Sequence, residues 1–262
     1  MRAIDSHAHL DHVESLDQVL KDAATAGVEG IIAVSVDGES MRKTLAIAGQ
    51  YNQPVIYPAL GIHPGNIQTE DIEPALAFQR ENIAAAVAVG EIGLDFWYKW
   101  VRKDKEKKDE QRRVFQRQLE VAAEFSKPAV IHTRGTWAEC LDMTKASGVK
   151  RAVFHWYSGP LDVLDRILEA GYYVSASPSL AQSPQSREAI AHAPLERTLI
   201  ETDTPVFYRY RDQEGGFTAG PKDVFRTLEA YCELKNTEAQ SALTRFNQNV
   251  RDLFGIKEIR PS

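Results

Sequence analysis

The chain contains 262 residues, of which 43% are hydrophobic and 26% are charged, and this globular composition excludes a disordered or fibrous protein. Its 31 basic and 37 acidic residues give a formal net charge of −6. This charge argues against a protein that coats DNA through a broad basic surface, but not against an enzyme that binds nucleic acid briefly.

Short apolar runs alternate with longer amphipathic stretches along the chain. The runs predict strands at residues 2–6, 30–36, 55–60, 84–90, 129–132, 152–155, 172–175 and 198–201. The amphipathic stretches predict helices at residues 16–26, 40–50, 71–82, 111–125, 136–146, 161–170, 222–234 and 237–253. Several strands are continuously apolar, which is typical of parallel strands covered on their outer face.

This alternation predicts an α/β protein, a closed (β/α)8 TIM barrel that forms a single domain over residues 1–262. The alternative is a doubly wound open sheet. Such a sheet usually carries a glycine-rich phosphate loop after its first strand, where this chain has histidines.

Histidines and carboxylates come directly after five of the predicted strands. In a (β/α)8 barrel, this C-terminal rim is where active sites are built. His7 and His9 are two residues apart, so both imidazoles should point into the barrel. The alternative, unrelated core histidines and capping acids, requires four of the seven histidines to reach equivalent positions by coincidence. The side chains expected at the rim are His7, His9, Glu91, His132, His155 and Asp203.

Four imidazoles and two carboxylates are too many ligands for one tetrahedral ion and suit two divalent ions about 3.5–4 Å apart. Glu91 is the expected bridge and is counted among the catalytic residues, because strand four lies between strand one and strands five and six. One ion would be held by His7, His9 and Asp203, and the other by His132 and His155. Such a mixed nitrogen and oxygen set accepts Mg²⁺, Mn²⁺ or Zn²⁺, so the identity of the metal stays open.

These residues belong to six short motifs. They are His7-Ala8-His9-Leu10-Asp11, Gly61-Ile62-His63-Pro64, Gly90-Glu91-Ile92-Gly93-Leu94-Asp95, His132-Thr133-Arg134, His155-Trp156-Tyr157-Ser158-Gly159 and Glu201-Thr202-Asp203-Thr204-Pro205. In order and spacing the set resembles the TatD family of metal-dependent deoxyribonucleases, within the amidohydrolase-like barrels. The resemblance covers nearly the whole chain. It implies a (β/α)8 barrel, two divalent ions on the ligands named above, and phosphodiester hydrolysis, often at DNA ends.

Two features refine the resemblance. Related amidohydrolases often bridge their metals with a carbamylated lysine on strand four, but this chain has Glu91 there and no lysine within residues 84–94, which favours the TatD branch. Family members commonly carry Asn-Glu-Pro after the basic loop that follows strand eight, whereas this chain reads Ala219-Gly220-Pro221. Substrate contacts made by that loop therefore cannot be transferred to this chain.

Several residues have candidate roles in catalysis. Metal-bound water can have a pKa near ~7, and Asp203 is the candidate to accept its proton and orient it. The resemblance places His63 near the substrate, as a hydrogen-bond donor to phosphate or an acid for the leaving oxygen; the alternative is a residue that fixes the turn. Arg134 should share a face with His132 and suits phosphate oxygens, unless it forms a surface ion pair. Glu201 is either a buried partner of a ligating histidine or a catalytic group.

Two segments near the rim mix aromatic and basic residues. Residues 96–108 follow strand four and 207–211 follow strand eight. Such segments can stack bases and neutralise phosphates of single-stranded nucleic acid. The alternative for the first is a solvated helix start with aromatics packed on the barrel.

Three functions remain open. The first is a phosphodiesterase acting on DNA, as single strands or ends. The second is hydrolysis of another ester or amide on the same metals, for example an aminoacyl ester on tRNA. The third is a non-catalytic metal-binding or nucleic-acid-binding module, which the complete ligand set disfavours.

The cysteine content and the length of the apolar runs indicate the cellular setting. The two cysteines, Cys140 and Cys232, predict neither a disulfide framework nor a cysteine-rich zinc site and fit a reducing compartment. No apolar run approaches the ~18 residues of a membrane span, and the first residues do not resemble a signal peptide. We expect a cytoplasmic protein with no membrane partner, and no obligate protein partner is evident.

Overall fold

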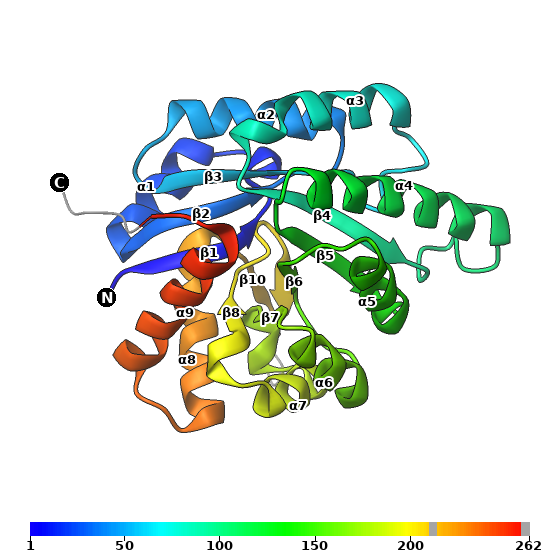
Figure 1. Ribbon diagram of the computed structural model, residues 1–262. Coiled ribbons are helices and arrows are strands. Elements are labelled where there is room, and N and C mark those ends of the chain that lie inside the picture. The colour runs from blue at the N-terminus through cyan, green and yellow to red at the C-terminus, as the bar shows by residue number, and fades with distance from the viewer. Residues whose placement is uncertain (210–213, 258–262) are drawn as a thin grey trace.

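The computed structural model describes residues 1–209 and 214–257, in which eight parallel strands form one sheet in chain order (Figure 1). The strands are β1 (Ala3–Ala8), β2 (Val28–Val34), β3 (Val55–Leu60), β4 (Ala88–Asp95), β5 (Ala129–Arg134), β6 (Ala152–Phe154), β7 (Tyr173–Ala176) and β8 (Thr198–Ile200). A short antiparallel hairpin of β9 (Phe207–Arg209) and β10 (Gly216–Thr218) follows them. The predicted (β/α)8 architecture is confirmed.

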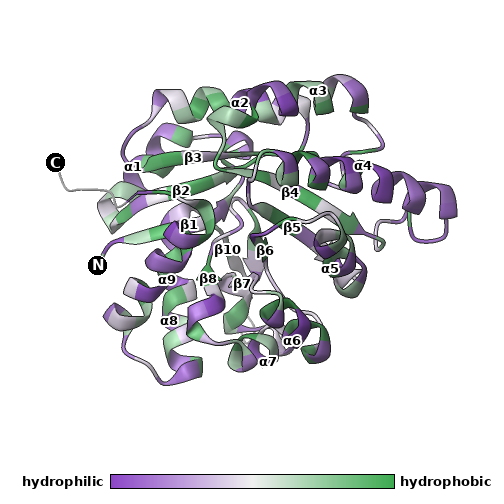
Figure 2. Ribbon diagram, in the orientation of Figure 1, coloured by the Kyte–Doolittle hydropathy of each residue, from purple (hydrophilic) through white to green (hydrophobic). Residues whose placement is uncertain are grey.

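Helices follow the strands and lie around the sheet, and hydrophilic residues lie along their outer faces (Figure 2). They are α1 (Leu16–Ala26), α2 (Gly38–Gln50), α3 (Ile72–Asn82), α4 (Lys105–Glu124), α5 (Trp137–Ala146), α6 (Leu161–Glu169), α7 (Pro184–His192), α8 (Val224–Lys235) and α9 (Ala239–Phe254). None of the helices in the described ranges is both long and apolar enough to cross a bilayer.

The barrel closes through the segment that follows β8. The backbone amide of Asp203 donates to the His7 carbonyl at 3.0 Å, and that of His9 donates to the Thr204 carbonyl at 2.8 Å. Ala8 also pairs with Thr204 in a parallel bridge. Closure therefore brings Asp203 beside the two histidines of the first strand, as the closed-barrel prediction requires.

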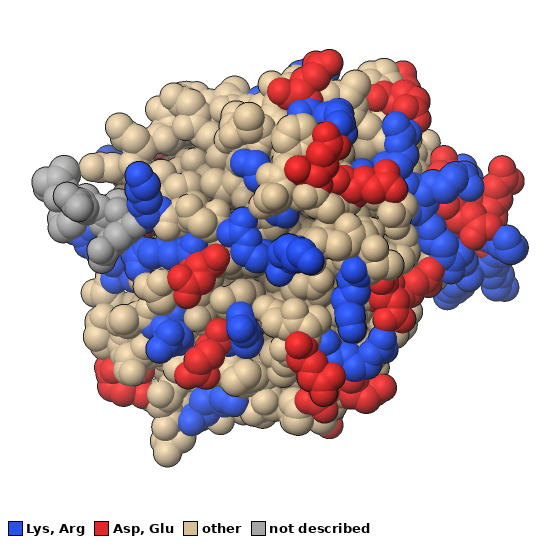
Figure 3. All heavy atoms as spheres, viewed as in Figure 1, with Lys and Arg blue, Asp and Glu red and all other residues tan. Residues whose placement is uncertain are grey.

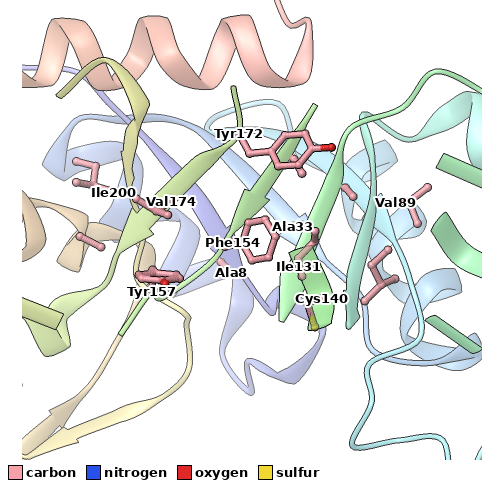
Figure 4. Packing of buried hydrophobic residues seen from close by; sticks show 14 of the residues in the cluster. Ala8, Ala33, Val89, Ile131, Cys140, Phe154, Tyr157, Tyr172, Val174 and Ile200 are labelled. Atoms are coloured by element: carbon pink, nitrogen blue, oxygen red, sulfur yellow. The ribbon is translucent and has the colours of Figure 1, made fainter. Parts of the chain in front are cut away.

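Alternation along the strands separates two apolar layers. Ile131 and Phe154 pack outward with helix residues, and Figure 4 shows them side by side in this layer. Val130 and Val153 belong to a second cluster inside the barrel, which the end of α9 also contacts. Two residues further along the same face are His132, in the C-terminal half of β5, and His155, directly after β6.

Several predicted boundaries are wrong for identifiable reasons. Strand β4 runs from Ala88 to Asp95 because residues 83–85 form a 3-10 turn, so Glu91 lies within the strand and not after it. Helix α4 begins six residues early, where polar residues without apolar periodicity are held by pairs such as Lys105–Asp109 at 2.7 Å. Helix α7 was missed because it buries few large apolar residues, although Ser183 caps it and Pro184 opens it.

Candidate metal centre

The structure brings all six predicted rim residues into one buried cluster. His7, Glu91 and His132 lie in strands, whereas His9, His155 and Asp203 lie in the first residues after β1, β6 and β8. Groups of potential ligands in this region of the described residues include His7, His9 and Asp203; His7, His155 and Glu201; and His63, Glu91 and His132. The clusters are consistent with a binuclear metal site.

One half of the cluster has the geometry of a four-ligand site. His7 Nε2 and His9 Nε2 are 3.3 Å apart, and each lies 3.3–3.4 Å from Glu91 Oε2 and from Asp203 Oδ1. Donors bound at ~2.0–2.1 Å in a tetrahedral zinc site are ~3.3–3.4 Å from one another. These donors therefore fit a divalent ion without rearrangement.

The other oxygen of Glu91 faces a second pair of imidazoles. Glu91 Oε1 lies 2.9 Å from His132 Nδ1 and 2.8 Å from His155 Nε2, and these two nitrogens are 3.3 Å apart. Glu91 thus stands between two nitrogen pairs, with one carboxylate oxygen toward each. This is the arrangement that a bridging carboxylate needs.

Carboxylates hold the remaining nitrogens of the second pair. His132 Nε2 lies 3.1 Å from Asp95 Oδ2, and His155 Nδ1 lies 3.3 Å from Glu201 Oε1. Such contacts fix the orientation of a ligating histidine. Of the two roles left open for Glu201, this geometry favours the histidine partner. Sequence reasoning missed the same role for Asp95, although Asp95 and His132 both end apolar runs on consecutive strands.

His63 contacts the cluster but differs from the other imidazoles. Its Nδ1 accepts a hydrogen bond from the Gly65 backbone amide at 2.9 Å, so the proton of the neutral ring is on Nε2, which lies 3.6 Å from Glu91 Oε1. Burial, together with the neighbouring imidazoles, lowers the pKa of His63 to about 3 despite the Glu91 charge. With its proton on Nε2, His63 can donate a hydrogen bond into the cluster, while its Nδ1 also holds the turn through Gly65.

The two carboxylates of the cluster are strongly acidic. Burial by itself would raise the pKa of Asp203, but the hydrogen bond with His9 and the nearby imidazoles lower it to about 2. Burial likewise opposes ionisation of Glu91, yet the surrounding imidazoles hold its pKa well below the usual range. Burial lowers and the two carboxylates raise the pKa of His9, to about 10. These buried carboxylates keep a neighbouring imidazole protonated when no metal is bound. A metal cation that binds here therefore displaces protons from the site.

The cluster opens into a cavity of about 490 Å³. Arg134, Tyr98, Asn66, Trp156 and Ser158 are among the residues that line it. The Arg134 side chain is 50% exposed, and its Nε lies 3.0 Å from Asp95 Oδ2. Arg134 is therefore an ion-paired residue that also lines the cavity, and its contact with phosphate oxygens stays a prediction.

The two aromatic and basic segments are only partly at the site. Tyr98 lines the cavity, whereas Trp97 is 65% exposed and not among its lining residues. Residues from Lys105 onward form the start of α4, as the alternative interpretation expects. In the second segment Tyr208 is buried and Phe207 is exposed, while 210 and 211 lie outside the described residues.

The face of the molecule drawn in Figure 3 shows no broad basic field. Lysines and arginines alternate with acidic side chains over the face drawn in Figure 3. The cavity itself offers positive charge for a phosphate substrate, because Arg134 lines it.

Gly93 lets β4 approach β5 beside the cluster. Its φ is +151°, and a Cβ there would lie 1.9 Å from the carbonyl oxygen of His132. We expect Gly93→Ala to displace the His132 backbone, to destabilise the fold by at least ~2 kcal/mol and to lower the metal content. Urea unfolding and elemental analysis check this. Gly148→Ala is the control, because Gly148 also has a positive φ, +77°, but nothing lies within 4 Å of its Cβ position; an equal effect of both variants would refute the close-approach argument.

Sequence comparison identifies the family. The family described as "TatD related DNase" matches residues 4–255. The chain belongs to the TatD family. This TatD-family chain is 27% identical to the human protein named "Deoxyribonuclease TATDN3" over 96% of this chain and 94% of the human one. It is 30% identical to the Escherichia coli protein named "Uncharacterized metal-dependent hydrolase YjjV", over 97% of this chain and 98% of that protein.

Solved structures of other TatD proteins have the same fold. The crystal structure of Escherichia coli YJJV, titled a TatD homologue, superposes with a TM-score of 0.87 at 28% identity and covers 98% of this chain and 99% of that one. A TatD-family hydrolase from Entamoeba histolytica superposes with a TM-score of 0.81 at 21% identity, covering 97% of this chain and 98% of that one. The protein is thus a TatD-family member of the amidohydrolase superfamily, and metal-dependent hydrolysis is its general chemistry.

Proposed function

We propose that this protein is a metal-dependent phosphodiesterase that hydrolyses DNA, as single strands or at ends, on two divalent ions. The observation that carries the proposal is the position of Glu91, whose two oxygens face separate pairs of imidazole nitrogens. The name of the human relative, a deoxyribonuclease, supports DNA as the substrate. The ligand set proposed for the ions is His7, His9, Glu91, His132, His155 and Asp203.

Bound divalent ions would lower the pKa of a bound water, so that hydroxide is available near neutral pH, and would stabilise negative charge on the phosphoryl group. Glu91 holds the two halves of the site at a fixed separation. Asp203 stays ionised, because its pKa is about 2, and offers a carboxylate that accepts the proton of the attacking water and orients it.

Two further side chains suit the substrate. His63 points its Nε2–H into the cluster, where it donates a hydrogen bond to a phosphate oxygen or to the leaving oxygen. The Arg134 guanidinium, fixed on one side by Asp95, has donors left for phosphate oxygens in the cavity. Neither role requires a basic surface outside the cavity.

The experiment is a substrate panel on protein stripped of metal and reloaded with Mg²⁺, Mn²⁺ or Zn²⁺. The panel contains single-stranded DNA, blunt and frayed duplex DNA, RNA, a generic phosphodiester and a misacylated tRNA. We expect metal-dependent cleavage of DNA, fastest on single strands or frayed ends. Turnover of the aminoacyl ester alone would replace the nuclease assignment by a deacylase, and no turnover with any reloaded metal would favour a non-catalytic module.

A further inference from the structure

Trp156 is a large aromatic residue at the site with no part in holding the proposed ions. It follows His155 directly, and its partly exposed side chain lines the cavity together with Glu91, Asp203 and Arg134. Within the described residues, the indole belongs to neither of the apolar clusters that form the core. Core packing therefore does not explain a tryptophan here.

The backbone of Trp156 is held in an unusual conformation. Its φ is +43°, a region that residues other than glycine, asparagine and aspartate seldom occupy. The Trp156 amide donates to Ser175 Oγ and to Glu201 Oε1, both at 3.0 Å. Glu201 also contacts His155 Nδ1, so one carboxylate fixes both the imidazole and the residue that carries the indole. A strained backbone of this kind is kept only where several surrounding contacts fix it, and such positions are common at ligand sites.

Two further aromatic rings, tilted to one another, pack beside the indole. The ring centroids of Trp156 and Tyr208 are 5.5 Å apart, and those of Tyr208 and Phe217 are 5.7 Å apart. The Arg226 guanidinium lies 4.5 Å from the Phe217 centroid, and the Tyr208 hydroxyl donates to the Thr202 carbonyl at 3.0 Å. The indole is thus a preorganised flat surface that needs little ordering when a ligand binds.

We propose that Trp156 is a stacking platform for the nucleobase of a nucleotide next to the scissile phosphate, an inference that rests on the proposed phosphodiesterase function. The indole shares one cavity with the metal cluster and Arg134, so a phosphate bound there has its sugar and base within the same space. Stacking on an aromatic ring accepts any base, because every base has a π-face. A base in a duplex must first leave its own stack, so the platform favours single-stranded or frayed substrates over paired ones.

The test is an abasic scan on the metal-loaded, full-length protein. Single-stranded DNA oligonucleotides carry one tetrahydrofuran abasic unit at successive positions around the cleavage site, and kcat/KM is measured for wild type, Trp156→Ala and Trp156→Phe. We expect wild type to lose about 5- to 100-fold at one position, mainly through KM. Trp156→Ala should lose a similar factor on the intact oligonucleotide and show no further loss at that position, while Trp156→Phe should recover much of it.

Controls distinguish a loss of base stacking from a loss of folding and from a failure of the proposed nuclease function. Metal content and circular dichroism show whether each variant retains the site, and Trp156→Phe supports the test if the alanine variant loses metal. Phe125→Ala, which removes an exposed aromatic at the end of α4, should match wild type throughout. Wild-type cleavage with equal abasic penalties in Trp156→Ala would overturn the platform alone. Absence of cleavage of any oligonucleotide by wild type would overturn the nuclease function itself.

Discussion

Replacing Glu91 with alanine is expected to abolish hydrolysis and to lower the number of divalent ions that the protein holds. Glu91 is 1% exposed, and it is the one carboxylate in the described part of the chain that pairs with His7, His9, His132 and His155 together. Its removal leaves the two nitrogen pairs without their shared anion. The loss of activity should exceed the ~10–100-fold that is typical of outer partners of metal ligands.

The measurement combines initial rates on single-stranded DNA with elemental analysis after removal of free metal. We expect fewer than two ions per chain in Glu91→Ala. Glu91→Gln keeps the size of the side chain but replaces one carboxylate oxygen by an amide, so it should retain the fold and still lose most activity. Glu120→Ala, on the exposed face of α4, is the control and should match wild type. Near-native rates in a folded Glu91→Ala protein would refute the bridging role.

Local sequence patterns predict much of this architecture. Strands such as Ala129–Arg134 are continuously apolar until a histidine, because both faces of a parallel barrel strand are buried and only its C-terminal end meets solvent. An apolar run that ends in a histidine therefore predicts both the strand and the candidate ligand. The end of helix α1 at Ala26 is equally predictable, because the next residue is Gly27, whose φ is +103°.

Other features depend on partners from distant strands and leave little local signal. The hydrogen bond from Gly65 that sets the His63 proton on Nε2, and the contact of Asp95 with His132, are fixed only when loops and neighbouring strands assemble. Sequence could place His63 near the site but could not choose between a donor to the substrate and a residue that fixes the turn. The same holds for Trp156, whose motif gives no hint that its ring packs beside Tyr208, 52 positions later in the chain.

The ligand positions follow from closure of the barrel more than from any single motif. Asp203 is separated from His7 by most of the chain, yet backbone hydrogen bonds between the segment after β8 and the end of β1 place the two side chains 3.4 Å apart. Glu91 reaches the same point from the opposite part of the strand order. A barrel that did not close would separate these groups, so the site and the fold stand together.

Substitution of Asp203 by asparagine should separate catalysis from metal holding. Asparagine tolerates the left-handed backbone at this position, where φ is +52°, and keeps an oxygen near His7 and His9. It loses the negative charge and the ability to take up a proton. We expect kcat to fall by ~10²–10⁴-fold, the range typical of a lost general base, with metal content close to wild type at saturating metal.

The contrast between the two variants carries the argument. If Asp203 serves chiefly as the proton acceptor, Asp203→Asn loses turnover while elemental analysis still finds two ions, unlike Glu91→Ala. Asp142→Asn, at an exposed position of α5, controls for the loss of one carboxylate charge. Parallel losses of metal and activity in Asp203→Asn would make Asp203 a ligand first and remove the proposed proton transfer. Unchanged kcat with both ions present would exclude Asp203 from the chemistry. The contacts of its carboxylate with His7 and His9 would then have a structural role alone.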